Sequence, residues 1–205
     1  MLSGHCICDL IPRLTLRTHV TLVMHQREWT KTTNTGHLAL RSLTRSSLFL
    51  WGGEEAQNEA PPAPEAIVPP GTVGYVLAPS GQPLTPERVE ILNAGPPLTI
   101  VATDGSWRQA TKMLRRIPAI AALPRLSLPP GALSNYQLRT EPHPEGLATF
   151  EAIARTLGLL EGDDLRVTLE RPFLAMVSRT LLTRGILSEP TAASRDSVPE
   201  AKPLA

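Results

Sequence analysis

Short apolar runs alternate with helix-like segments along most of this chain. The runs over residues 19–25, 47–51, 72–78 and 98–102 predict buried strands, and residues 125–128 form a shorter fifth candidate. Apolar or β-branched residues fill nearly every position of these runs, as is typical of strands covered by helices on both faces. The pattern therefore favours a mostly parallel sheet.

Helix signals fall between and after these runs. The pattern predicts helices that begin at Asn34 or Thr35 and after Thr85, and others over residues 106 to about 121, 146–157 and 163 to about 183. Pro172 lies inside the last of these, where it should shift the start of the helix or kink it. Alternating strands and helices indicate an α/β domain, a mostly parallel sheet flanked by helices. In such domains ligands bind at the carboxyl ends of the strands, which here are the loops after His25, Ala78, Ala102 and Leu128.

Two stretches depart from this pattern. Residues 54–70 are acidic, rich in Ala and Pro and poor in large apolar groups, so we expect a flexible exposed loop that buries little surface. Residues 187–205 have the same character and are expected to form a disordered tail. The remaining residues, 1–186, are enough for one domain with a sizeable core.

Composition adds weak constraints. The formal net charge is +1, so any binding to nucleic acid must come from local basic patches. No apolar run approaches the ~20 residues needed to span a bilayer. The N-terminus also lacks the pattern of a secretory signal. We therefore expect a cytoplasmic protein without membrane contact, and the sequence leaves its oligomeric state open.

The two cysteines, Cys6 and Cys8, are separated by one residue. A disulfide across this spacing would be strained. Two thiols supply at most half of a tetrahedral zinc site, to which His5 and His25 could add ligands in principle. The alternative is that both cysteines are free thiols.

The junction after the fourth apolar run holds the most informative residues, Asp104-Gly105-Ser106-Trp107. Gly105 allows a sharp turn and a close approach of a ligand. Asp104 stands where a carboxylate either caps the following helix or faces a ligand at the end of the strand, and spacing alone leaves both open. Trp107 shares an apolar helix face with Leu114 and Ile117, which favours core packing.

Three further segments contain polar residues suited to binding. Arg108, Lys112 and Arg115 recur at helical spacing, which suits a phosphate backbone but is also typical of an ordinary solvated face. The loop after the first strand contains Lys31 and then Asn34-Thr35-Gly36. Tyr136 precedes the 146–157 helix, where it could stack on a base or lie on the surface. Thr149 could cap that helix or contact a ligand.

Together these segments resemble the DTW-domain family of tRNA-uridine aminocarboxypropyltransferases. The family's Asp-x-Thr-Trp motif stands here as Asp104-Gly105-Ser106-Trp107, followed by Lys112-Met113 and Arg115-Arg116. The other matching segments are Glu28 with Lys31 and Asn34-Thr35-Gly36, then Ser134-x-Tyr136-x-Leu138-Arg139, then Thr149-x-Glu151-Ala152. The resemblance runs from about Cys6 to Gly185, and its motifs occur in the family's order.

The resemblance implies a SPOUT-like fold with a deep knot in the C-terminal half and S-adenosylmethionine bound in the knot loops. The residues it implies for that cofactor are Asn34, Val101, Gly105, Ser106, Trp107, Leu126, Ser134, Tyr136, Leu138, Arg139 and Thr149. Asp104 is the implied catalytic base, and Arg139 or Asn34 could hold the carboxylate of the transferred group. The residues expected to meet tRNA phosphates are Lys31, Arg108, Lys112 and Arg115.

The chain departs from the family pattern in two places. Ser106 replaces Thr, which keeps the hydroxyl and loses a methyl group. Family members usually have a Cys-x-x-Cys pair upstream of Cys-x-Cys, and the four thiolates bind zinc. This chain has only Cys6 and Cys8, so residues 1–17 are expected to be the remnant of a zinc-ribbon-like N-terminus. Either the chain starts too late, or it binds no zinc.

The activity implied by the resemblance is transfer of the 3-amino-3-carboxypropyl group from S-adenosylmethionine to N3 of a uridine in tRNA, with release of methylthioadenosine. Two other functions stay open. One is an RNA methyltransferase of the same superfamily, which would release S-adenosylhomocysteine. The other is a non-catalytic RNA-binding module that has lost its cofactor.

Overall fold

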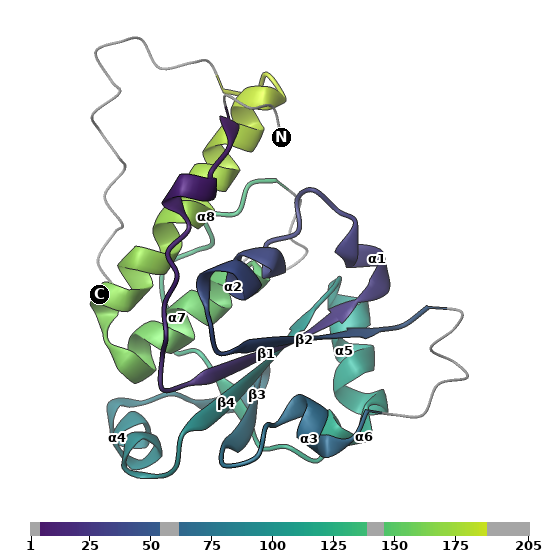
Figure 1. The fold of residues 1–205 in the computed structure, drawn as a ribbon, viewed down its shortest axis with the longest axis vertical. Helices are drawn as coiled ribbons and strands as arrows, with labels where there is room; N and C mark the ends of the chain where they lie inside the picture. The colour runs from purple at the N-terminus through teal and green to yellow at the C-terminus, as the bar shows by residue number, and fades with distance from the viewer. Residues whose placement is uncertain (1–4, 54–61, 139–145, 188–205) are drawn as a thin grey trace.

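A five-stranded parallel sheet forms the centre of the molecule (Figure 1). The structure is a computed structural model and describes residues 5–53, 62–138 and 146–187. The strands lie in the order β2-β1-β4-β3-β5, and every neighbouring pair is parallel. Their bounds are β1 His19–His25, β2 Ser46–Trp51, β3 Val73–Pro83, β4 Leu98–Asp104 and β5 Arg125–Ser127. The predicted α/β class with a parallel sheet is confirmed.

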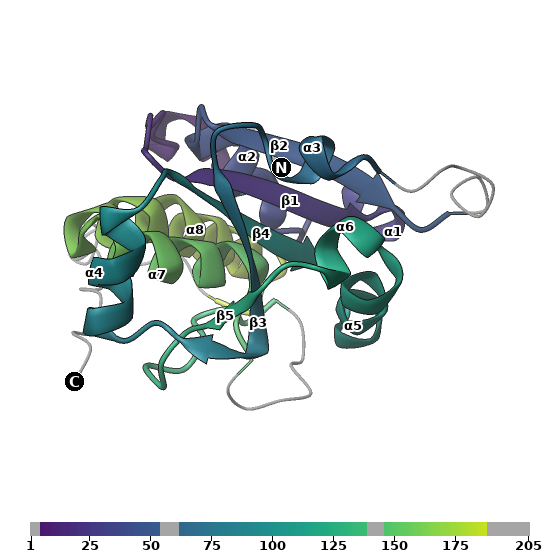
Figure 2. The same ribbon diagram turned by 90° about the horizontal axis from the view of Figure 1, so that it is seen from below.

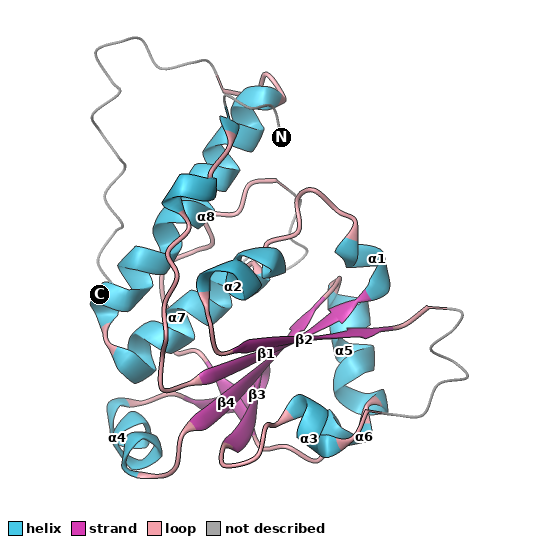
Figure 3. Cartoon of the chain, in the orientation of Figure 1, coloured by secondary structure: helices cyan, strands magenta, loops and turns pink. Residues whose placement is uncertain are grey.

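Helices cover both faces of this sheet (Figures 2 and 3). On one face, Leu22 of β1 packs in a hydrophobic cluster with residues of α2, α7 and α8. In a second cluster, residues of β3 and β4 pack against α4. On the other face, Val23 and Val101 pack against α3, α5 and α6. Cys8–Leu10 form a short 3-10 helix, η2. The α-helices are α1 Gln26–Trp29, α2 Gly36–Ser42, α3 Pro64–Ile67, α4 Pro86–Ala94, α5 Trp107–Arg116, α6 Pro118–Ala121, α7 Thr149–Glu161 and α8 Asp163–Thr183.

The helix predicted over 106 to about 121 is two helices, and the single-helix prediction is wrong. α5 ends at Arg116, and α6 begins at Pro118. Ile117 between them has an extended backbone, with φ −95° and ψ 105°. The ring of a proline clashes with a helical residue before it and supplies no N–H, so Pro118 ends the first helix.

The start of α7 differs from the prediction, whereas α8 spans the predicted residues, Asp163–Thr183. α7 begins at Thr149, three residues after the predicted Gly146. Gly162 is the N-cap of α8, so Asp163 occupies the first turn and is not the cap. The 21 residues of α8 form one helix that contains Pro172, and the start of that helix is not shifted by the proline.

Part of the segment predicted as an exposed loop is built into the core. Residues 54–61 lie outside the described part, but Pro64–Ile67 form α3 with Pro64 in the first turn. Ile67 is fully buried, and its carbonyl accepts a hydrogen bond of 2.7 Å from the hydroxyl of Thr21. Ile67 is the exception among residues 62–70, of which residues 63–66 are exposed. The predicted tail over residues 187–205 lies almost entirely outside the described residues.

The N-terminal segment runs alongside α8 (Figure 1). Ile7 is buried in the same core cluster as α8, and Arg179 of that helix donates a hydrogen bond to the carbonyl of Cys6. Three expectations stay predictions. They are the origin of the N-terminal segment as a zinc-ribbon remnant, the domain limit at residue 186, and the knot. Among the described residues, no helix is both long and apolar enough to cross a membrane.

The burial of Ile67 gives a direct test of α3. Replacing this fully buried side chain in Ile67→Ala leaves a cavity, which should lower the free energy of unfolding by about 2–5 kcal/mol. Ile91→Ala is the matched control because that side chain is 73% exposed, and it should change stability by less than about 0.5 kcal/mol. Urea unfolding of both variants measures the difference, and equal stabilities would show that α3 does not pack as described.

Candidate functional site

A buried carboxylate lies at the carboxyl end of β4. Asp104 is only 5% exposed, and it shares a sheet face with Ala102, toward α2 and α7. Its Oδ2 accepts a hydrogen bond of 2.5 Å from Nδ2 of Asn34, and its Oδ1 accepts one of 2.6 Å from Oγ1 of Thr149. Asn34 and Thr149 are 70 and 45 residues from Asp104 along the chain, so three distant motifs meet at one side chain.

Asp104 is not the cap of the following helix. Ser106 is the N-cap of α5, and its hydroxyl accepts from the backbone N–H of Gln109 at 3.4 Å. The side chain of Gln109 in turn accepts from the backbone N–H of Ser106 at 2.7 Å, which completes a capping box. Spacing left two roles open for Asp104. Ser106 caps α5, and contact of Asp104 with a ligand stays a prediction.

The Asn34-Thr35-Gly36 segment fits closely around this carboxylate. Besides its bond to Asp104, Asn34 accepts a hydrogen bond from the backbone N–H of His37 at 3.3 Å. The hydroxyl of Thr35 accepts from the backbone N–H of Phe150 at 3.3 Å, which ties α2 to the first turn of α7. A Cβ on Gly36 would lie 2.7 Å from Oδ2 of Asp104, so only glycine allows α2 to start this close to β4.

Tyr136 belongs to the core and not to the surface. It is 8% exposed, and its ring stacks on Phe173 with centroids 6.3 Å apart and planes inclined by 27°. Its hydroxyl donates a 2.8 Å hydrogen bond to the carbonyl of Thr33, next to Asn34. The ring contact with Phe173 does not favour the predicted stacking on a base, but the hydroxyl links this segment to the Asp104 site.

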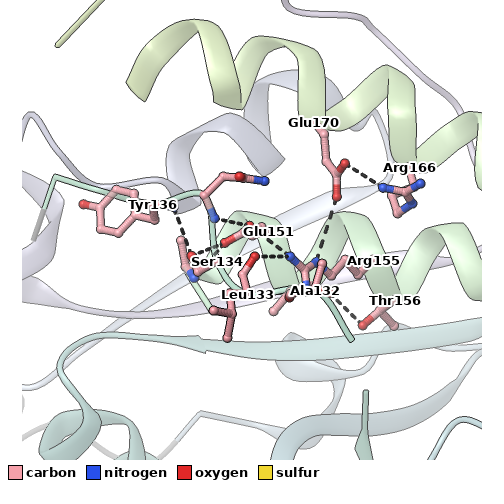
Figure 4. Close-up of polar contacts among 12 residues, drawn as sticks. Ala132, Leu133, Ser134, Tyr136, Glu151, Arg155, Thr156, Arg166 and Glu170 are labelled. Atoms are coloured by element: carbon pink, nitrogen blue, oxygen red, sulfur yellow. Dashed lines mark hydrogen bonds and ion pairs between the residues drawn. The ribbon is translucent and has the colours of Figure 1, made fainter. Parts of the chain in front are cut away.

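The segment that contains Tyr136 is held by a buried pair of charges on α7 (Figure 4). Glu151, which is 1% exposed, accepts hydrogen bonds from Ser134 and Asn135 and pairs with Arg155 at 3.2 Å. From the sequence, Glu151 was named only as part of a motif shared with the family, and Arg155 was not singled out. Opposite charges four positions apart on one helix were the signal that could have identified the pair.

The other residues predicted to bind the cofactor differ in how far they are buried. Val101, Leu126 and Leu138 are buried in hydrophobic clusters, so their side chains pack against the protein. Gly105 and Trp107 are partly exposed, which differs from the predicted core packing of Trp107. Arg139 lies outside the described residues.

Four exposed cations gather on α5. Arg108, Lys112, Arg115 and Arg116 line a common surface depression of about 250 Å³. We call this group of four the α5 basic surface. The ammonium group of Lys112 lies 5.8 Å from the ring centroid of Trp51, a cation–π geometry. Lys31, the fourth predicted phosphate contact, is placed elsewhere and pairs with the buried carboxylate of Glu28 at 2.5 Å.

His25 lies at the same edge, between the ends of β1 and β2. Its ring meets Trp51 edge-on at 6.2 Å, and its Nδ1 accepts from the backbone N–H of Arg27 at 3.2 Å. Burial first, and then the charge of Arg27, lower the pKa of His25 below its ordinary value. A neutral imidazole therefore stands beside the α5 basic surface and adds no further positive charge at neutral pH.

The cysteines are exposed and close together. The backbone N–H of Cys8 donates to Sγ of Cys6 at 3.5 Å, and this hydrogen bond is the main cause of the lowered pKa of Cys6. Within residues 5–53, 62–138 and 146–187, no three His, Cys, Asp or Glu side chains are grouped so that they could hold a metal ion. Zinc binding by Cys6 and Cys8 stays a prediction.

Gly36 offers a test of the packing around Asp104. Gly36→Ala should lower the free energy of unfolding by about 1–3 kcal/mol, because its Cβ would meet Oδ2 of Asp104 at 2.7 Å and Leu22 at 2.8 Å. Gly95→Ala is the control, since there the added Cβ comes no closer than 3.5 Å to a neighbour. Thermal unfolding followed by circular dichroism compares the two, and a Gly36→Ala protein as stable as Gly95→Ala would contradict the close approach.

Comparison with known proteins identifies the family of this chain. The model of the DTW domain family matches residues 1–181. Two relatives share the name tRNA-uridine aminocarboxypropyltransferase 2. The protein of Drosophila melanogaster is 26% identical over 170 residues, covering 82% of this chain and 67% of its own length. The protein of Macaca fascicularis is 26% identical over 177 residues, covering 84% of this chain and 59% of its own length.

Among solved structures, the SAM-dependent rRNA:acp-transferase Tsr3 from Vulcanisaeta distributa matches with a TM-score of 0.49 and 17% identity, over 82% of this chain and 80% of that chain. The chain spans about three fifths to two thirds of the length of the curated relatives given above. The family match covers most of the chain, from residue 1 to residue 181. This chain belongs to the DTW domain family.

Proposed function

We propose that this protein transfers the 3-amino-3-carboxypropyl group of S-adenosylmethionine to N3 of a uridine in tRNA. The observation that supports this most is the convergence of Asn34 and Thr149 on the buried Asp104 at the carboxyl edge of a parallel sheet. This edge is where α/β domains bind ligands. Membership of the DTW domain family and the names of the relatives supply the chemistry.

The same edge of the sheet suits a co-substrate with a long flexible chain. Three segments end or begin there, namely the β4–α5 junction at Gly105, the residues after β5, and the first turn of α7. Val101, Leu126 and Leu138 are proposed to contribute backbone groups only, because their side chains are buried. Side-chain contacts are proposed for Asn34 and Thr149, which are polar and bind Asp104. Ser134 is proposed to contribute backbone groups, because its hydroxyl donates to Glu151.

The proposed reaction is a displacement at carbon. The N3 lone pair of uridine forms a bond to the methionine carbon next to the sulfonium, that carbon–sulfur bond breaks, and its electron pair stays on sulfur. Methylthioadenosine leaves as a neutral molecule, and the proton of N3 passes to a base. Which carbon of the sulfonium reacts depends on which one is held in line with N3.

Asp104 is proposed as that base. Its carboxylate is oriented by Asn34 and Thr149, one donor on each oxygen, so the group is held in a single direction. Fixed orientation is what general-base catalysis requires, since the acceptor oxygen must lie within hydrogen-bond reach of the proton. Because Asp104 is buried, the uridine must be unstacked and inserted to reach it.

The α5 basic surface is proposed to bind the phosphate backbone of the tRNA. α5 begins three residues after Asp104, so its exposed cations lie next to the proposed reaction site. Four cations on one surface depression can displace counterions from a phosphate chain. Lys31 is proposed to add a contact from the loop before α2. A tRNA substrate is also the basis on which we propose a cytoplasmic location.

The transfer has a direct test in the products. Purified protein, tRNA and S-adenosylmethionine should yield methylthioadenosine together with a tRNA nucleoside heavier by one aminocarboxypropyl group, both measured by mass spectrometry. Asp104→Asn keeps the size of the side chain but removes the base, so the rate should fall at least about a hundredfold.

Three outcomes would contradict the proposal in different ways. Formation of S-adenosylhomocysteine would show a methyltransferase. Absence of S-adenosylmethionine binding in calorimetry would show a non-catalytic module. Wild-type product levels with Asp104→Asn would leave the transfer standing and remove Asp104 as the base.

The phosphate contacts have a separate test. Arg108→Ala with Arg115→Ala should weaken tRNA binding and reduce the slope of log K against log salt by about one unit for each lost contact. Arg171→Ala is the matched control, because Arg171 is an exposed arginine of α8, a helix that both views place away from α5 (Figures 1 and 2). Filter binding at several salt concentrations measures the slopes, and equal slopes for all proteins would exclude the α5 basic surface as the tRNA contact.

A further inference from the structure

The residues after β5 form an irregular loop that is held by side chains. Between Gly131 and Tyr136 the chain has no helix or strand, so the sheet does not fix its path. We call residues 131–136 the post-β5 loop. Its polar groups are instead bound from one direction, by Glu151 and Arg155 of α7 (Figure 4).

Five interactions connect Glu151, Arg155 and the post-β5 loop, and we call the two charged residues the clamp. Glu151 accepts from the hydroxyl of Ser134 at 2.5 Å and from the backbone N–H of Asn135 at 2.9 Å. Arg155 donates to the carbonyl of Ala132 at 2.5 Å and to that of Leu133 at 3.2 Å. The fifth interaction joins Glu151 and Arg155 themselves at 3.2 Å. Each charged group thus binds both its partner and the loop.

The clamp is buried, and a second acid extends it. The side chains of Glu151 and Arg155 are 1% and 10% exposed, and Glu170 of α8 lies 4.0 Å from the guanidinium of Arg155. Burial raises the pKa of Glu170, although Arg166 and Arg155 act in the opposite direction. Buried ion pairs add little net stability because desolvation offsets their attraction, so the clamp is better explained by the geometry that it fixes.

The clamp is connected to the Asp104 site at two points. Thr149, two residues before Glu151, binds Asp104 directly. Tyr136, at the end of the post-β5 loop, donates to the carbonyl of Thr33 beside Asn34. The loop and Asp104 are therefore held at a fixed separation by the first turn of α7 on one side and by the 33–34 segment on the other.

The backbone of the loop is fixed although one of its apolar side chains is not packed. Leu133 is 68% exposed, yet its carbonyl is bound by Arg155. An exposed leucine on a loop that buried charges hold in place is suited to meet an apolar part of a ligand, such as the face of an adenine ring.

We propose that Glu151 and Arg155 are positioning residues that hold the post-β5 loop as one side of the S-adenosylmethionine site. This inference rests on the proposed function, since it names the same co-substrate. Neither residue takes part in the transfer itself. Loss of the clamp therefore weakens binding of S-adenosylmethionine, whereas kcat at saturating S-adenosylmethionine stays largely unchanged.

The test compares Glu151→Gln with a control at the far end of the same charge network. Glu151→Gln replaces a charged acceptor with a neutral amide, and it should raise the Kd and KM for S-adenosylmethionine by about 10- to 100-fold while kcat changes by less than about threefold. Ser134→Ala removes one hydrogen bond to Glu151 and should raise both constants by less. Asp163→Asn is the control, because Asp163 pairs with Arg166 at 2.6 Å and no bond from it to the loop is found among the described residues. It should leave both constants within about twofold.

A second measurement does not depend on activity. Hydrogen exchange of the backbone N–H of Asn135, which donates to Glu151, should become faster in Glu151→Gln and stay unchanged in Asp163→Asn. Unchanged exchange, or an unchanged Kd with a reduced kcat, would overturn the positioning role. A wild-type protein that binds S-adenosylmethionine but releases no methylthioadenosine would contradict the proposed transfer. The Kd values of the variants would still test the positioning role of Glu151 and Arg155. A wild-type protein that binds no S-adenosylmethionine overturns both.

Discussion

The buried carboxylate of Asp104 is the constraint on which the arrangement of the site depends. A carboxylate removed from water must be compensated by hydrogen bonds, or it destabilises the fold by several kcal/mol. Asn34 and Thr149 supply two such bonds from different elements. The requirement brings the start of α2 and the start of α7 to the end of β4, and Gly36 is needed because any larger residue would collide with the same carboxylate. One charge thus accounts for three motifs that look unrelated along the chain.

The order of the strands explains why these segments can meet at all. β1 and β4 are neighbours at the centre of the sheet, with Met24 in register with Asp104. From β1 the chain crosses to β2 on one side and later returns to build β3, β4 and β5 on the other. In open α/β sheets, ligands bind beside such a reversal, outside the carboxyl ends of the strands. α1 and α5, which follow β1 and β4, leave from this place.

The sequence predicted the elements better than the contacts between them. Strand β1 was predicted with its observed bounds, His19–His25, because an apolar run with β-branched residues suits a strand covered on both faces. The break at Pro118 was missed although proline is a local signal for the end of a helix. The start of α7 at Thr149 was missed by three residues, because local patterns locate helix ends poorly. The burial of Ile67 was missed because an Ala/Pro-rich setting hides a single core residue. Asp104 was predicted as a site residue, but its hydrogen bonds to Asn34 and Thr149 were not predicted, because pairs 70 and 45 residues apart leave no local signal.

The first turn of α7 joins the two halves of the proposed site. Thr149 and Glu151 are two residues apart on a helix, so their side chains point in different directions and cannot bind the same group. Thr149 reaches Asp104, and Glu151 reaches the post-β5 loop. A helix is rigid over one turn, so the distance between the proposed base and the loop is set by the backbone of α7 and not by either side chain. Phe150 between them is fully buried and its N–H is bound by Thr35, which anchors that turn to the core and to α2. A change that loosens the packing of Phe150 would therefore displace both sides of the site together, whereas a change in Thr149 or Glu151 displaces only one.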